Sequence, residues 1–145
     1  MKVLSLRQPW ADIVVNGPKR IENRRWPTSF RGTFLIHAAK GMTLAEYGEA
    51  VRFARKVDPK CPIRDPKDPL LLRGGIIGRA RLVDVIPPCL PDFCPHPWHM
   101  FGQYGFVLED VTPLPFEPLR GMLGFFEHTS PEQRSDSATN GGDHG

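Results

Sequence analysis

The sequence has no apolar stretch near the roughly 18 residues that cross a bilayer, so we expect no transmembrane helix and no membrane partner. Its first residues pass at once into the polar Ser5 and Arg7, so we expect no secretory leader. There are only three cysteines, an odd number without the spacing of a disulfide framework. Such sparse cysteine is typical of a cytoplasmic protein in a reducing compartment. These absences exclude membrane proteins and small disulfide-rich secreted proteins.

Negative charge is scarce in the first part of the chain. Residues 1–81 carry 17 Lys and Arg against 7 Asp and Glu, a net charge of +10, whereas residues 82–145 carry 2 against 9, a net charge of −7; the two sum to the +3 of the whole chain. A basic half suits an anionic ligand such as nucleic acid. If the two halves interleave in the fold, however, the charges mix and the surface shows no such asymmetry.

The composition favours one β-rich domain. At 145 residues, with 16 prolines and 14 glycines, the chain is long enough for one core and too rich in turn formers for a helical bundle. We predict a mixed β-rich α+β fold with a short helix ending at Gly17 and a longer helix from a Thr43/Glu46 capping box to Asp58. The predicted strands cover residues 2–6, 20–26, 33–39, 76–86, 104–111 and 121–127. The domain is expected to span residues 1–128, and residues 129–145, with Ala138 as their only apolar side chain, to form a disordered tail.

The densest chemistry lies in residues 16–24. Gly17 ends the apolar run of the first helix, and Lys19, Glu22 and Arg24 follow within eight residues. In an extended strand side chains alternate, so Glu22 and Arg24 share one face, and Lys19 at the strand entrance can reach Glu22. An acid between two cations stays ionised when partly desolvated and orders both long side chains. The alternative interpretation is a surface strand with alternating charges.

This segment, Gly17-x-Lys19-x-x-Glu22-x-Arg24, resembles the signature of the ASCH domain, a member of the PUA-like barrel superfamily. The likeness covers roughly residues 2–128 in the order of the family, and it includes the stretches 4–11, 35–40 and 105–108, Trp26 and Arg31-Gly32. The resemblance implies a small PUA-like β-barrel of about six strands with a short and a longer helix at the rim. It also implies a cleft where the first strand, the short helix and the motif meet.

The resemblance and the adjoining residues predict which side chains form the site. Trp10 and His37 each have a second interpretation, as core residues. Trp26 offers a flat face on which a base can stack. We predict a cleft lined by Ser5, Gln8, Trp10, Lys19, Glu22, Arg24, Trp26 and His37, and phosphate contacts from Arg7, Arg20, Arg24, Arg25 and Arg31.

The leading functional hypothesis is a monomeric module, without a cofactor, that binds RNA or DNA, preferably RNA, or a modified base or nucleoside. A second hypothesis is a small amidohydrolase of acylated nucleosides such as acetylated cytidine, to which known members of the family are similar; Lys19 and Glu22 are then catalytic. Those enzymes carry a hydroxyl residue where Glu22 stands and a distal glutamate, whereas the late strand here has Arg79 and Arg81. A third hypothesis is a ribonuclease that uses His37 or Lys19 as its acid–base group.

One further group of residues resembles a metal site. Cys89, Cys94, His96 and His99 carry the donor atoms of a zinc set. Their spacing matches no common zinc finger, and four ligands within 11 residues leave little chain to surround an ion. We therefore predict a proline-rich crossover loop here and no metal site.

Overall fold

The computed structural model describes residues 1–128 of the chain, and the disordered tail predicted for residues 129–145 lies outside that range. It contains the two helices and six strands that the sequence predicts. In chain order they are β1 (Lys2–Leu6), α1 (Trp10–Val15), β2 (Ile21–Arg24), β3 (Gly32–Ala38), α2 (Leu44–Val57), β4 (Gly75–Ile86), β5 (Tyr104–Pro118) and β6 (Phe125–Glu127). Within residues 1–128 no helix is long and apolar enough to cross a membrane.

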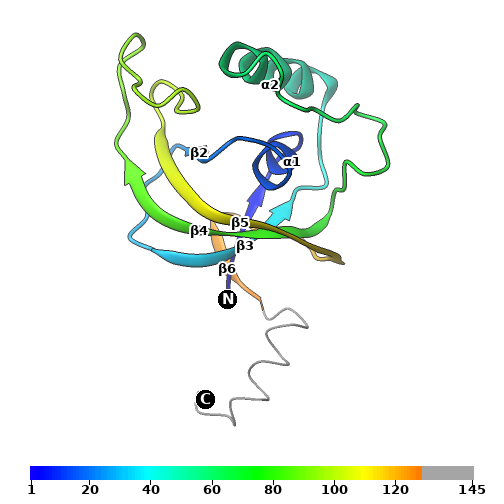
Figure 1. The fold of residues 1–145 in the computed structure, drawn as a ribbon. Helices are drawn as coiled ribbons and strands as arrows, with labels where there is room; N and C mark the ends of the chain where they lie inside the picture. Colours follow the sequence, from blue (N-terminus) through cyan, green and yellow to red (C-terminus); the bar gives the residue numbers. More distant parts are fainter. Residues whose placement is uncertain (129–145) are drawn as a thin grey trace.

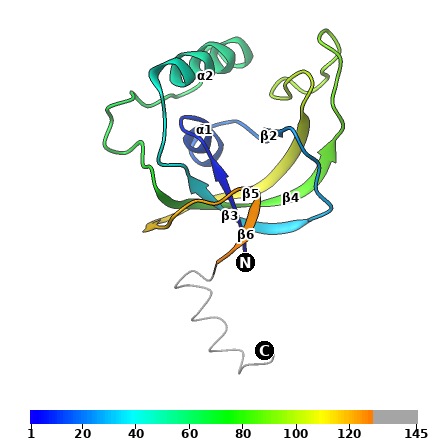
Figure 2. The same cartoon turned by 180° about the vertical axis from the view of Figure 1, so that it is seen from behind.

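The six strands form one mixed sheet in the order β2-β5-β4-β3-β1-β6. The sheet curls into a half-barrel, with α1 in its concave side and α2 beyond α1 (Figures 1 and 2). β1 and β3 run parallel, and Ser5 lies opposite His37 in their register. This fold confirms the predicted β-rich α+β class with a barrel-like sheet and two helices.

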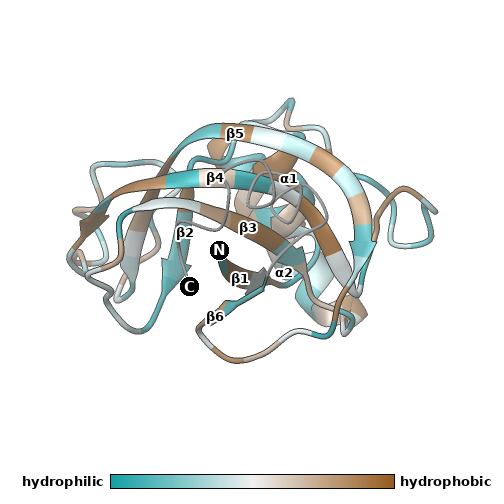
Figure 3. Ribbon diagram, turned by 90° about the horizontal axis from the view of Figure 1, so that it is seen from below, coloured by the Kyte–Doolittle hydropathy of each residue, from teal (hydrophilic) through white to brown (hydrophobic). Residues whose placement is uncertain are grey.

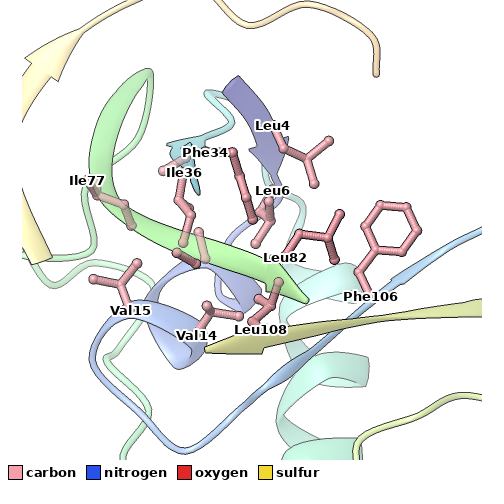
Figure 4. Close-up of a cluster of buried hydrophobic side chains, with 13 residues drawn as sticks. Leu4, Leu6, Val14, Val15, Phe34, Ile36, Ile77, Leu82, Phe106 and Leu108 are labelled. Atoms are coloured by element: carbon pink, nitrogen blue, oxygen red, sulfur yellow. The ribbon is translucent and has the colours of Figure 1, made fainter. Parts of the chain in front are cut away.

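The main core fills the space between the concave face of the sheet and α1. Apolar side chains of β1, β3, β4 and β5 meet Val14 and Val15 of the helix (Figure 4). From below, β5, β4 and β3 form successive arcs on which hydrophobic and hydrophilic stretches alternate (Figure 3). A second cluster, in which Ile13 and Ile21 are buried with Ala54 and Trp98, joins α1 and β2 to α2. The two helices thereby hold β2, which carries the motif, in a fixed position.

The capping box predicted at the start of α2 is confirmed. The Thr43 hydroxyl accepts a hydrogen bond from the Glu46 backbone N–H (3.1 Å), and the Glu46 carboxylate accepts one from the Thr43 backbone N–H (3.2 Å). These two bonds satisfy amide groups that the first turn of a helix leaves unpaired. They also fix Glu46 on the side of the helix that faces Arg7.

The predicted end of β5 near Val111 is wrong, because the strand continues to Pro118. β2 pairs with only the first part of β5, from Tyr104 to Val107, so the later part has an open edge. Proline is tolerated at an open edge because its missing N–H is not needed there. β5 also lies very close to β4: a Cβ added to Gly75 would lie 2.5 Å from the Glu117 carbonyl oxygen. Conversely, the last strand is shorter than the predicted range 121–127, because only Phe125–Glu127 pairs with β1.

Candidate functional site

The turn after α1 determines where the motif begins. A Cβ on Gly17 would lie 2.7 Å from the Ile13 carbonyl oxygen, so the close return of the chain requires glycine. One terminal nitrogen of Arg20 donates to the carbonyl groups of Val14, Gly17 and Lys19, at 3.1, 2.9 and 3.0 Å. These carbonyls belong to the end of the helix and the turn. Arg20, predicted to contact phosphate, therefore uses this nitrogen to cap the helix.

Lys19, Glu22 and Arg24 form one buried ionic cluster, as their spacing predicts. The Lys19 ammonium is 1% exposed and donates to the Ile21 carbonyl (2.5 Å) and to Glu22 Oε1 (3.2 Å). On the other side of Glu22, Arg24 Nε lies 3.2 Å from Oε2, an ion pair in which the N–H is not aligned for a hydrogen bond. Burial lowers the pKa of Lys19, and the neighbouring Glu22 carboxylate only partly offsets that effect. The ammonium also lies 5.0 Å from the ring of Trp10.

Arg24 connects the two sides of the half-barrel. Its Nη2 donates to the Ser5 carbonyl of β1 (2.5 Å), although β2 and β1 are four places apart in the strand order. Its guanidinium also lies 5.8 Å from the ring centre of Trp26. Arg24 of the motif therefore links β2 to β1 across the open side of the sheet, and its hydrogen bond holds the Ser5 backbone in position.

Ser5 and His37 form a hydrogen-bonded pair on β1 and β3. Ser5 Oγ lies 2.8 Å from His37 Nδ1, and His37 Nε2 lies 2.6 Å from the Leu119 carbonyl oxygen. In the neutral ring Nε2 must carry the proton that it donates to this carbonyl, so the Ser5 hydroxyl donates to Nδ1. Gly121 packs directly on the pair, because a Cβ there would lie 2.8 Å from His37 Cε1 and 3.2 Å from Ser5 Oγ.

The pair lines a cavity of about 900 Å³ that reaches the surface between β1, β3 and the segment after β5. Three cations also line it, Arg7, Lys40 and Arg120, and all three are exposed. Its remaining lining is mostly small or apolar: Ala39, Gly41, Gly74, Pro118, Leu119, Gly121, Met122 and Leu123. Met122 and Leu123 expose their side chains, Leu123 to 99%. A cationic rim around a partly apolar hollow suits an anion attached to a flat or apolar group.

Arg7 is already paired at this rim. Its Nε and Nη2 donate to the two carboxylate oxygens of Glu46, at 2.5 and 2.7 Å. These bonds lower the pKa of Glu46 to about 2 and raise that of Arg7. Arg7 therefore offers little net positive charge to a ligand while Glu46 is ionised.

The other predicted site residues lie apart from the cavity. Gln8 is buried, donates to the Leu72 carbonyl (2.8 Å) and accepts from the Asp12 backbone N–H (2.9 Å), so it holds α1 in place. Trp10 and Trp26 each pack edge-to-face on core aromatic rings. Arg25 and Arg31 are exposed between β2 and β3. Of the predicted residues the structure thus brings Ser5, Arg7 and His37 to the cavity.

Sequence reasoning missed Lys40, Arg120 and Gly121, which also line the cavity. Lys40 is the second residue after β3, and the other two lie beyond β5, about 80 residues later. Lys40 stood in a stretch that resembles the family, which was a weak signal. Nothing local marked Arg120. The glycines of residues 121–127 allow close approach of a ligand or backbone, but only the return of the chain past β5 places Arg120 and Gly121 beside Ser5 and His37.

The cysteines also differ from the expectation of free thiols. Cys89 and Cys94 form a disulfide, whereas Cys61 is free and buried. His99 lies close to the disulfide, and the three residues belong to the loop between β4 and β5. The sequence predicted a crossover here, but this loop joins two neighbouring antiparallel strands.

A curled six-stranded sheet braced by a motif cluster defines a small PUA-like β domain. The family model "ASCH domain" matches residues 4–120, and the chain belongs to this family. Over 88 residues the chain is 34% identical to activating signal cointegrator 1 of Mus musculus, and over 87 residues it is 36% identical to the protein of that name from Homo sapiens. Each match covers 57% of this chain and only 14% of the relative.

Two crystal structures of single-substitution variants of ZmASCH from Zymomonas mobilis have a similar fold. Their TM-scores are 0.56 and 0.57, at 15% and 16% sequence identity. The matches cover 96% and 95% of this chain and 94% and 96% of those chains. At this level of identity the likeness establishes the fold alone.

Proposed function

We propose that this ASCH domain binds single-stranded nucleic acid, with one nucleotide held in the cavity beside Ser5 and His37. The observation that carries the proposal is the combination of that cavity, about 900 Å³, with Lys40 and Arg120 on its rim. Hollows of roughly 300–1,000 Å³ hold small ligands, so one nucleotide fits. RNA is the preferred partner, and DNA or a free modified nucleoside are the alternatives that the experiment separates.

Cations that line two cavities, Arg120, Lys40, Lys67 and Arg73, form what we call the basic track, and they favour a nucleic-acid ligand longer than one nucleotide. A second cavity, of about 780 Å³, shares Lys40 with the first and is also lined by Lys67 and Arg73. Asp68 contributes one negative charge to this second cavity. Phosphates that follow one another along a strand can contact successive cations of such a track. Met122 and Leu123 add apolar surface to the lining of the first cavity, against which a base can pack.

The position of Lys19 favours binding over the amidohydrolase hypothesis. Its ammonium is buried and donates to two groups of the following strand β2, the Ile21 carbonyl and the Glu22 carboxylate. A substrate carbonyl therefore has no access to this amine in the described conformation, although a nucleophile or general base must come within about 3 Å of its target. We assign Lys19, Glu22 and Arg24 a supporting role: they hold the strand that carries Ser5.

The salt dependence of binding tests the proposal. We expect a fluorescent 12-nucleotide RNA to bind with an affinity that falls as salt rises, because bound phosphates release counterions. Replacing both Lys40 and Arg120 by Ala should make the slope of log affinity against log salt shallower by about 1.4. Each lost phosphate contact with a single strand accounts for about 0.7 of this change. Fluorescence anisotropy at four salt concentrations measures the slope, and DNA of the same sequence and single nucleosides are compared.

The matched control removes two exposed charges elsewhere. Arg52 and Lys56 lie on α2 and line a different cavity, so their replacement by Ala should change the slope by less than the Lys40/Arg120 pair does. An equal effect of both pairs would mean that the basic track is not the binding surface. If the wild-type chain binds no oligonucleotide at any salt concentration, the proposed function is wrong.

Glu46→Gln should strengthen binding. The substitution removes the charge that neutralises Arg7, and glutamine still serves in a capping box at this position, so α2 keeps its cap. One released cation should steepen the salt slope by about 0.7 and raise affinity at low salt by up to about fivefold, the scale of one exposed charge contact. The same anisotropy titration measures both values. Glu49→Gln, on the exposed side of the same helix, is the control, and an equal gain in that variant would rule out a specific effect through Arg7.

A further inference from the structure

We propose that Cys89, Cys94 and His99 bind a zinc ion when the two cysteines are reduced. One donor atom from each residue lies within 4.8 Å of the others, a spacing that one ion can bridge. All three belong to the loop between β4 and β5, which does not line the proposed nucleic-acid cavity. This inference is independent of the proposed function.

His99 is arranged as a metal ligand. Its side chain is 3% exposed, and Nε2 lies 2.6 Å from the Gln103 carbonyl oxygen, to which it donates its proton. Nδ1 then carries a lone pair, and this buried atom has no hydrogen-bond partner within residues 1–128. Histidines that bind metals commonly donate their other N–H to a backbone carbonyl in this way, which fixes the ring and its tautomer. A buried acceptor without a partner is costly, and a metal ion would satisfy it.

The backbone around the ring keeps His99 in place. A Cβ added to Gly105 of β5 would lie 3.1–3.2 Å from three atoms of the imidazole, so the ring packs directly on the strand. At the other side of the loop, the Asn23 side chain donates to the Trp98 carbonyl (3.0 Å) and accepts from the Met100 backbone N–H (2.8 Å). Residues on both sides of His99 are therefore tied to β2.

The loop folds back on itself, which the sequence spacing did not reveal. The Gly102 backbone N–H donates to the Cys89 carbonyl (3.3 Å), so the two ends of the loop meet. The short span of 11 residues that argued against a metal site is thereby no obstacle. The predicted loop is present, but it joins the neighbouring antiparallel strands β4 and β5 and is therefore a long hairpin connection and not a crossover.

The donor set favours zinc. Two thiolates and one imidazole are typical zinc ligands, and Zn–S bonds of about 2.3 Å in a tetrahedron place two sulfurs about 3.8 Å apart. In the structure the sulfurs of Cys89 and Cys94 are joined, with their Cα atoms 5.2 Å apart. A phosphine reductant gives two electrons to this bond and becomes the phosphine oxide, while one water molecule supplies the oxygen and the two protons, so that two thiols form. Zinc then displaces both thiol protons, which pass to the buffer. The fourth position is open to His96, on the same loop, or to water.

Zinc titration of the reduced full-length chain tests this proposal. The chain is reduced with a phosphine, and three free thiols per chain confirm that Cys61, Cys89 and Cys94 are reduced. We then expect one zinc per chain, measured against a competing chelator. Because loss of a supporting contact already costs 10–100-fold in metal affinity, Cys94→Ser and His99→Gln should each lower it by at least about 100-fold.

Two comparisons make the result specific. Cys61→Ala, which removes the buried cysteine outside the loop, should leave zinc affinity within a few fold of wild type. His96→Gln identifies the fourth ligand: a loss as large as that of His99→Gln assigns it to His96, and a small change assigns it to water, and both outcomes support the three-ligand site. Zinc binding that survives Cys94→Ser overturns the proposal.

Cobalt and heat give tests that need no variant. Thiolate ligands give bound Co²⁺ near-ultraviolet charge-transfer absorption, which we expect for the reduced wild-type chain and not after thiol alkylation. Zinc at 100 times its Kd should raise the melting temperature of the reduced chain by roughly 5–10 °C. If the fully reduced wild-type chain binds neither metal, the three residues form a disulfide loop with an adjacent histidine and no metal site.

Discussion

Glu22→Gln is expected to lower the free energy of unfolding by about 3–5 kcal/mol at pH 7. Glu22 lies between the buried Lys19 ammonium and the Arg24 guanidinium, and breaking a buried ion pair leaves an uncompensated charge. The loss has a limit, because Lys19 can release its proton instead. Removing the proton from a lysine with the ordinary pKa of 10.5 at pH 7 costs about 5 kcal/mol, at 1.36 kcal/mol per pH unit, and this cost is the upper limit of the loss. Urea unfolding at fixed pH measures the change.

The pH dependence of this loss provides a second test. In the variant, folded Lys19 releases its proton at a lower pH than unfolded Lys19 does, so the unfolded chain binds more protons below pH 10.5. The stability of the variant must then rise with pH in that range, and its deficit relative to wild type should be smaller at pH 9 than at pH 7. Adding Lys19→Met to Glu22→Gln should recover part of the stability, because it removes the buried charge.

Glu127→Gln is the matched control for Glu22→Gln. Glu127 also contacts two cations, the N-terminal amine at 3.2 Å and Lys2 at 3.1 Å, but its side chain is 65% exposed. Exposed ion pairs contribute roughly 0–1 kcal/mol, so this variant should unfold almost like wild type. Equal losses in the two variants would show that burial does not decide the strength of the motif cluster.

Gly121→Ala should weaken nucleic-acid binding by at least about 10-fold with little loss of stability; this expectation rests on the proposed function. The added Cβ would lie 2.8 Å from His37 Cε1, and His37 cannot move without losing its bonds to Ser5 and Leu119. The exposed segment around residue 121 must shift instead, which changes the cavity and not the core. Overpacking of this kind costs about 1–3 kcal/mol, and because the shift changes the cavity we expect this cost in the free energy of RNA binding, where about 1.4 kcal/mol corresponds to a 10-fold loss of affinity. RNA anisotropy and thermal melting measure the two effects.

Gly48→Ala, on α2, is the matched substitution. Only the Arg52 side chain approaches that position, at 3.4 Å, and alanine favours a helix over glycine by about 1 kcal/mol. This variant should bind RNA like wild type and melt at a slightly higher temperature. If Gly121→Ala binds RNA as tightly as wild type while the Lys40/Arg120 variant still changes the salt slope, the strand follows the basic track without entering the cavity.

Local patterns determined most of the secondary structure. The alternation in residues 2–6 predicted β1, and the capping box at Thr43 predicted the start of α2 to within a residue. The Lys19, Glu22 and Arg24 cluster was also predictable, because its members lie close together and the alternation of a strand places two of them on one face. The end of β5 was not predictable: the later prolines usually stop a strand, and only the open edge beside β2 permits them.

The candidate sites depended on contacts that no local pattern contains. The Arg24 bond to the Ser5 carbonyl joins strands four places apart, and the cavity needs Arg120 and Gly121 to return beside β1 and β3. His99 became a ligand candidate only when the loop folded back and left its Nδ1 buried without a partner within residues 1–128. Side-chain alternation and capping act over a few residues, so the sequence alone determined the elements and the motif cluster. Which surfaces and donor atoms meet depends on the packing of distant segments around one core, so the tertiary structure alone decided the cavity and the grouping of Cys89, Cys94 and His99.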